Sequence, residues 1–269
     1  MNPFTKISFT PNFRLGHVIE WKLDPLFRVE LPYTFTVQIA ETPDFSTITA
    51  ELDATDQYFA VDKTNTKRTL GDVTVYRIKL VSGDNTYYSQ SIMFGAQNAS
   101  TRNYLLAAEI QRKELLRISR YVPSQGWLLK RKTYGSPAVD NISFVTGQPI
   151  ADNVGDYGTG LVDGYYAPLG FMWSLDQQTQ NRGLKEQMVD VVEDYSLSIR
   201  TIGYPSLEVR DIIIDADTDL RYSIESHTSN VFPGTNIPLI QTAVLKELTP
   251  SDTIYQFPIP TKYINAHVL

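Results

Sequence analysis

The chain has 269 residues, a length that suits one large domain or two to three small ones. Of these residues 42% are apolar and 20% charged, fractions that are ordinary for a folded protein and argue against long disorder. The formal net charge of −6 argues against a wholly basic surface for nucleic acid. Cysteine is absent, which excludes disulfides, thiolate nucleophiles, iron–sulfur clusters and thiolate zinc sites.

Residues 1–95 are predicted to form a small antiparallel β-sandwich. Tyrosine, phenylalanine and β-branched residues are frequent in the chain, which favours strands. Five strand-like segments with alternating apolar and polar residues are separated by turns, as is typical of a sandwich; they span 17–24, 33–41, 57–62, 73–82 and 86–95.

Three features of this segment resemble a fibronectin type III domain. Trp21 lies in an early strand, FTVQIAETPDFS (35–46) follows a Pro-rich turn, and VYRIKLVSGDNTYYSQSIMF (75–94) lies near the end. The resemblance implies an Ig-like sandwich, a fold that serves many unrelated functions.

Residues 96–175 are predicted to contain one helix and a long irregular loop. The helix, TRNYLLAAEIQRKELLRISRY (101–121), is rich in good helix formers and has no internal Gly or Pro. GWLLKRKTYG (126–135) is expected to be a strand. From 135 to 170 the chain is rich in Gly, Pro, Asn and Asp, and long ordered loops of this kind usually have a function or form an interface.

Within this loop, DYGTGLVDGYYAP (156–168) contains a G-x-G-x-x-x-G string that loosely resembles a phosphate-binding loop. Such a loop needs a buried strand before it and a helix after it. Polar ADNVGDY (151–157) precedes Gly158 where the buried strand should lie, and Pro168 stands where the helix should run. We therefore predict a structural loop with glycines at positive φ and no bound nucleotide cofactor.

Residues 176–269 are predicted to form a small closed or half-closed β-barrel. Strand-like segments with short turns follow one another through this part of the chain; they span 191–202, 206–216, 219–230, 238–249 and 252–260. The overall fold class is therefore mostly β, with a sandwich, a connecting helix and loop, and a barrel.

Motifs for metal binding or catalysis are weak. Aspartates cluster between 211 and 219, but an EF-hand starting at Asp215 would need Gly and Glu where the sequence has Leu220 and Ser226. A solvated turn is therefore expected there, and a looser oxygen-ligand site stays open. The three histidines lie far apart and no G-x-S-x-G element is present. We expect no catalytic residues, metal or cofactor; a hydrolase is the enzyme alternative, and no motif supports it.

A basic cluster is the most informative charge feature. Seven Lys or Arg and one acid lie between 112 and 132, and Lys130, Arg131 and Lys132 are consecutive. The cluster is either a solvated helix face or an electrostatic docking patch for an acidic neighbour or nearby DNA.

Aromatic residues in and near the glycine-rich loop are a second candidate for contact with a partner. Tyr and Trp side chains combine an apolar ring with a polar tip, as interface anchors do. The alternative is local packing that keeps the loop ordered. The proposed contact residues are Asp163, Tyr165, Tyr166 and Trp173.

The C-terminal segment resembles the β-barrel of tailed-bacteriophage head-completion and neck proteins. It contains a D-x-I-x-D element at 211–215, an R-Y-x-I element at 221–224, and a later strand with Gln241 among alternating apolar residues. EIQRKELLRISRY (109–121), GWLLKRKTYG and YGTGLVDGYYAP (157–168) look like a stretch of phage neck and virion structural proteins.

This resemblance implies a non-enzymatic virion protein that forms a ring in the neck between portal and tail. Six or twelve copies, and portal, adaptor or tail proteins as partners, are implied by the resemblance alone. The expected segments are 1–95 (sandwich), 96–175 (connector) and 176–269 (barrel). We expect synthesis in the host cytoplasm, because neither a signal peptide nor a membrane span is visible. A tail or baseplate adaptor and a carbohydrate- or cell-surface-binding module are the alternatives.

Overall fold

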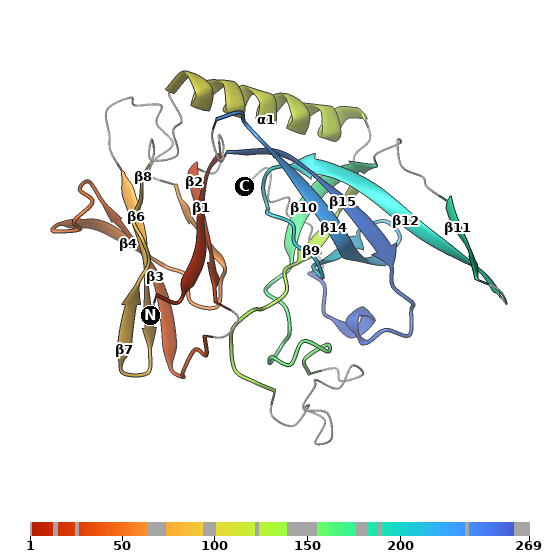
Figure 1. The fold of residues 1–269 in the computed structure, drawn as a ribbon, viewed down its shortest axis with the longest axis horizontal. Coiled ribbons are helices and arrows are strands. Elements are labelled where there is room, and N and C mark those ends of the chain that lie inside the picture. The colour runs from red at the N-terminus through yellow and green to blue at the C-terminus, as the bar shows by residue number, and fades with distance from the viewer. Residues whose placement is uncertain are drawn as a thin grey trace. The chain divides into compact units, whose positions relative to one another are not determined.

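The computed structural model confirms a mostly β chain (Figure 1). It describes residues 2–12, 16–24, 27–63, 74–93, 101–121, 124–138, 155–175, 182–187, 190–234 and 237–260. These residues belong to two compact units. The first comprises Met1–Glu109, Lys132–Ala138 and Phe232–Ile237, and the second comprises Ile110–Arg131, Val139–Val231 and Pro238–Leu269.

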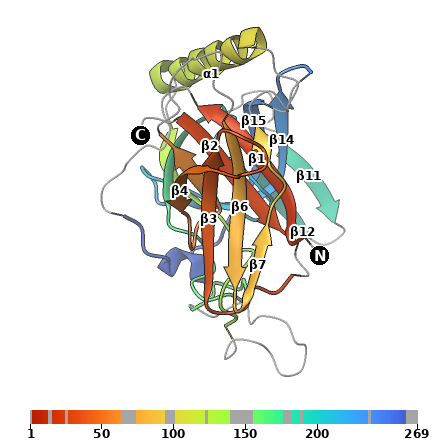
Figure 2. The ribbon, with the colours of Figure 1, turned by 90° about the vertical axis from the view of Figure 1, so that its left-hand side faces the viewer.

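The first unit contains two antiparallel sheets. One has the strand order β1-β2-β5, with β1 (Phe4–Asn12), β2 (Gly16–Leu23) and β5 (Phe59–Asp62). The other has the order β4-β3-β6-β7 (Figure 2), and a short β8 also pairs with β6. Its strands are β3 (Tyr33–Ala40), β4 (Ile48–Asp53), β6 (Val75–Ser82), β7 (Asn85–Tyr88) and β8 (Ile92–Met93).

Aromatic rings join the two sheets of the first unit. Trp21 of β2 stacks on Phe35 of β3 with ring centroids 5.8 Å apart. Phe9 of β1 stacks on Tyr76 of β6 at 5.7 Å. All four side chains are buried, and aromatic pairs of this kind contribute much of a core's apolar area. The predicted N-terminal β-sandwich is confirmed.

Helix α1 (Thr101–Tyr121) has the bounds that its sequence predicts. Its C-terminal half belongs to the second unit, where Ile118 packs against Met172 and Ile202. Two polar contacts hold the same part of the helix: Gln111 donates to the carbonyl of Pro238 at 2.6 Å, and Glu114 pairs with Arg200 at 3.0 Å.

The second unit contains a closed barrel of six strands. The order β10-β9-β13-β14-β15-β12 closes on itself because β10 also pairs with β12. The strands are β9 (Ser124–Leu129), β10 (Leu169–Leu175), β12 (Asp190–Ile202), β13 (Ile212–Asp215), β14 (Arg221–Val231) and β15 (Pro238–Glu247). Its interior is apolar and receives side chains from every strand, including Leu128, Phe171, Ile199, Ile213, Ile224 and Leu245.

One side of the barrel is also covered on its outer face. Leu129 and Ile212 of neighbouring strands pack there against Tyr165 and Phe257, which come from the glycine-rich loop and the C-terminal segment. Burial on both faces explains why GWLL and IIID read as continuous apolar runs with little alternation.

The segment boundaries differ from those expected. Two of the barrel's strands, β9 and β10, come from residues assigned to the connector. The predicted strand 252–260 is instead a 3₁₀-helix, η3 (Thr253–Gln256), whose first turn begins where the Asp252 side chain accepts from the Ile254 amide at 3.0 Å. Pro258 and Pro260 follow it and cannot donate to a sheet ladder.

An additional strand, β11 (Arg182–Gln187), extends the sheet beyond the barrel. It pairs with Asp190–Tyr195, the first half of β12, whereas the second half of β12 pairs with β15. Figure 1 shows this hairpin reaching away from the barrel.

Candidate functional site: a buried polar network in the barrel

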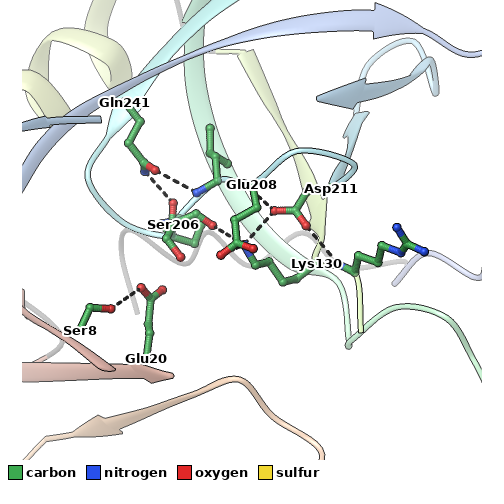
Figure 3. A network of polar contacts seen from close by, with 10 residues as sticks. Ser8, Glu20, Lys130, Ser206, Glu208, Asp211 and Gln241 are labelled. Carbon is green, nitrogen blue, oxygen red and sulfur yellow. Dashed lines mark hydrogen bonds and ion pairs between the residues drawn. The ribbon is translucent and has the colours of Figure 1, made fainter. Parts of the chain in front are cut away.

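Lys130 lies directly after β9 and is buried, with 6% of its surface exposed. Its ammonium donates to Asp211 Oδ2 at 2.9 Å and to the carbonyl of Ser206 at 3.0 Å. Glu208 Oε1 lies 3.1 Å from the same nitrogen (Figure 3). Three oxygens therefore surround an ammonium that has three protons to donate.

Asp211, directly before β13, is the second buried charge of this network. Besides Lys130, its carboxylate accepts from the amides of Arg131 at 3.1 Å and of Glu208 at 2.8 Å. Burial raises the pKa of Asp211 to about 6, although Lys130 acts in the opposite direction. The carboxylate thus joins the end of β9 to the loop before β13.

Gln241 of β15 holds the other end of the same loop. Its carbonyl oxygen accepts from the Leu207 amide at 2.9 Å, and its amide nitrogen donates to the carbonyls of Ile202 at 3.0 Å and Pro205 at 2.8 Å. A loop that crosses a barrel end has backbone groups that need partners. Gln241, Lys130 and Asp211 provide them.

The network fixes an exposed loop tip formed by Val209 and Arg210. Val209 is 51% exposed, and Arg210 has a φ of 72°, a conformation rarely taken by residues other than glycine. The Arg210 amide donates to the carbonyl of Ile224 at 2.9 Å. Such a conformation persists only where the surrounding contacts impose it.

A second buried cation, Arg221 of β14, holds the segment that follows β15. Its guanidinium donates to the carbonyls of Ile254 and Phe257 and lies 5.0 Å from the ring centroid of Tyr255. Burial lowers the pKa of this guanidinium. The R-Y-x-I element marked this position as part of a motif, but its contact with η3 was not predicted.

The two motif elements and Gln241 therefore act on the backbone of the barrel. The residues of this network bind main-chain groups or one another, an arrangement suited to fixing loops. Within the described ranges, no three His, Cys, Asp or Glu side chains gather in a way that could hold a metal ion.

The structure corrects the contact residues predicted around the glycine-rich loop. Tyr165, Tyr166 and Trp173 are buried, with 8%, 5% and 2% of their surfaces exposed. Tyr165 packs under the C-terminal segment, and Trp173 lies inside the barrel. These rings have little surface left for a neighbour, so local packing, the alternative, describes them. Asp163 is exposed.

The predicted electrostatic patch also requires correction. Lys130 is an interior ion-pair partner, and Arg131 and Lys132 are half-buried. Arg131 forms an isolated β-bridge with Tyr165. Lys132 belongs to the first unit, whereas the other two belong to the second. The three consecutive cations therefore do not form one exposed surface.

The glycine-rich loop binds its own carboxylate. Asp156 is fully buried and accepts from the amides of Gly158 and Gly160, each at 3.1 Å. These are the amides that a phosphate would need. Gly158, Gly160 and Gly164 all have positive φ, which confirms the structural loop predicted from the sequence.

The remaining candidates have ordinary structural settings. The turn after β13 is closed by Asp215, which accepts from the Asp217 amide at 2.9 Å. His17 lies in the sandwich, 2.6 Å from the Tyr76 hydroxyl, which donates to Asp62 at 2.8 Å; burial lowers the pKa of His17. His267 lies outside the described residues.

Comparison with models of protein families, with curated proteins and with solved structures found no match to this chain. Among the residues whose structure is described, no helix has the length and apolar character needed to cross a membrane.

Proposed function

We propose that this chain is a structural, non-enzymatic protein of a tailed-phage particle, and that it forms a ring of its own copies in the neck between portal and tail. The observation that carries the proposal is a six-stranded barrel held by the residues of the motif that resembles head-completion and neck proteins. Asp211 and Gln241 fix the loop before β13, and Arg221 fixes the segment after β15.

The buried polar chemistry supports an assembly role over a catalytic one. Lys130 and Asp211 are bound to each other and to main-chain groups, so neither is poised as a nucleophile or base facing a substrate. Strands that continue beyond the barrel, β11 and β12 in particular, give it surfaces suited to binding neighbours. Portal, adaptor and tail proteins remain the proposed partners, with DNA passing nearby.

The test is reconstitution of particles. Phage heads and tails made without this chain should fail to join, and the purified full chain should restore joining. A tag on the chain should then appear at the neck in negative-stain images. A tag at the tail tip would instead support the baseplate alternative. Protein that stays monomeric at high concentration and joins neither heads nor tails would contradict the proposal.

Glycan binding by the sandwich is a second candidate, favoured by one surface feature. Tyr88 is 46% exposed, and the Arg77 guanidinium lies 4.2 Å from the ring centroid of Phe45 and 4.4 Å from that of Tyr88. Gln38 accepts from Arg77 at 2.7 Å and restrains it further. A fixed, exposed ring is suited to stacking on a sugar.

A glycan array separates this candidate from the first. The full chain should bind a carbohydrate, Tyr88→Ala should abolish the signal, and Tyr88→Phe should retain it. An array without signal from the full chain would remove the candidate and leave the neck proposal unaffected.

A further inference from the structure

The outer part of β14 forms an exposed edge of the barrel sheet. On one side β14 pairs with β13 through Arg221, Tyr222 and Ser223 only. From Ser226 to Val231, its partner among the described strands is β15. All residues from 225 to 231 are exposed, so both faces of this part of the strand are open to solvent.

This edge has few of the features by which proteins protect open strands. Between 225 and 231 there is no Lys and no Pro, and Glu225 is the only acidic or basic residue apart from His227. Irregular register occurs at the two ends, between Ile224 and Ser226 and between Asn230 and Val231. The stretch between them is regular, and a regular, weakly charged edge is a template for another strand.

A second edge lies at the opposite end of the strand order. β11 is the last strand of the seven-stranded order and pairs with β12. Over Asp190–Tyr195, the partner of β12 among the described strands is β11 (Figure 1). A two-stranded hairpin is marginally stable in water, and a third strand stabilises it.

We propose that β11 of one copy pairs with the β14 edge of a second copy, so that identical chains join head to tail. Each chain then supplies one strand edge to a neighbour and receives one from another neighbour. The contact is heterologous and forms a closed ring where the rotation between copies allows. This inference rests on the proposed self-assembly and identifies the surface that performs it.

The dimensions and charges of the two edges agree with this pairing. β11 has 6 residues, and the regular part of the β14 edge, 226–230, spans a similar length at about 3.3 Å per residue. β11 contains Arg182, Lys185 and Glu186, a net positive set, and the β14 edge contains Glu225. Strand addition supplies affinity mainly through main-chain hydrogen bonds.

Cross-linking tests the pairing directly, because the chain has no cysteine of its own. Full-length Ser229→Cys is mixed with full-length Lys185→Cys in one experiment and with full-length Glu186→Cys in another. Two partners are used because adjacent residues of a strand point to opposite faces of the sheet. Side chains paired across strands lie about 5 Å apart, within reach of a disulfide. We expect a mixed dimer in one of the two mixtures and none from any variant alone.

A charge placed on the edge provides an independent test with a matched control. Thr228→Lys introduces a cation at the β14 edge, and Thr218→Lys introduces the same change at an exposed turn of the same unit. We expect about a tenfold weaker self-association for Thr228→Lys by sedimentation, equivalent to about 1.4 kcal/mol, and no change for Thr218→Lys. Equal association of the two variants, or cross-linking of Ser229→Cys with itself, would overturn the pairing.

The outcomes distinguish this inference from the proposed function. Mixed dimers from a chain that is absent from phage necks leave the pairing in place and reject the neck assignment. Rings that restore head-to-tail joining, but form no mixed dimer and tolerate Thr228→Lys, reject the pairing and leave the neck assignment in place.

Discussion

Lys130 and Asp211 are buried as a pair in the barrel, and each charge would be costly to bury alone. Their charges are 2.9 Å apart, and Asp211 accepts two further hydrogen bonds from the main chain. Removing one member of such a pair leaves the other charge buried without compensation. The two residues also join strands that are far apart in sequence, so the pair connects β9 to the loop before β13.

For Lys130→Met we expect a loss of about 3–5 kcal/mol in the free energy of unfolding. Lys246→Met is the matched control, because Lys246 is an exposed lysine of the same unit; its effect should stay within about 0.5 kcal/mol. Urea titrations of both variants measure the difference. Equal stability of the two would show that the buried pair contributes little.

The raised pKa of Asp211 gives the barrel a defined pH dependence. A carboxyl with a raised pKa in the folded state binds its proton more tightly when folded, so its stabilising contribution is complete below about pH 4 and is lost as pH rises through about 6. Asp211→Asn removes this contribution. Urea midpoints at pH 4, 5, 6 and 7 should therefore fall relative to the variant as pH rises; a relative increase would contradict the assignment.

Tyr165 and Tyr166 are predicted to stabilise the folded second unit. Truncating a buried aromatic ring to alanine costs about 3–5 kcal/mol, so Tyr165→Ala with Tyr166→Ala should unfold the second unit or lower its melting temperature strongly. Val162→Ala, at a 45% exposed position of the same loop, is the control and should change little. Circular dichroism on heating measures both. A folded double variant that fails only in assembly would restore the interface interpretation.

At the scale of elements, the glycine-rich loop folds tightly on itself and packs on one side of the barrel's outer face. Its backbone turns back so closely that a Cβ at Gly164 would lie 2.5 Å from the carbonyl oxygen of Asp156, and its φ is 59°. Gly234 has a similar φ of 75°, but apart from its chain neighbours no atom would lie within 4 Å of a Cβ at this position. The two glycines separate the cost of the backbone conformation from the cost of the close approach.

Gly164→Ala should therefore destabilise the chain more than Gly234→Ala. For Gly234→Ala we expect about 1–2 kcal/mol, the cost of a left-handed conformation at a residue with a Cβ. For Gly164→Ala the collision with the Asp156 carbonyl should add at least about 1 kcal/mol. Chemical unfolding of the two variants gives the comparison, and equal losses would show that the loop relaxes around the new methyl group.

Local patterns predicted elements well where a segment has one buried face. The alternation of β6 and the composition of helix α1 are examples, and α1 has the expected bounds. Prediction failed where contacts between residues far apart in the sequence determine the local structure. In residues 206–211, Leu207 and Val209 alternate with polar residues as in a strand, but Gln241 and Lys130 hold the segment as a loop. β10 was missed because burial of nearly every residue removes its alternation.

At the scale of the whole molecule, the sequence indicated a sandwich, a helix and a barrel in the correct order. It placed the barrel too late in the chain, because β9 and β10 precede the long β12 and are recognisable as barrel strands only by their pairing. The candidate site was harder to predict. Three consecutive cations suggest a surface, and only the carboxylate of Asp211, far along the chain, explains why Lys130 is interior.

The strand order of the barrel also bears on the protein's synthesis. β9 (Ser124–Leu129) is an early strand, whereas β15 (Pro238–Glu247), which pairs with both β12 and β14, is the last. The strands of the sandwich are complete by Met93. A chain emerging from the ribosome can therefore form the strands of its sandwich first. Leu128, Phe171 and the other interior side chains of the barrel stay exposed to solvent until β15 has been synthesised. We therefore expect the barrel strands to be the part of the nascent protein that most needs a chaperone.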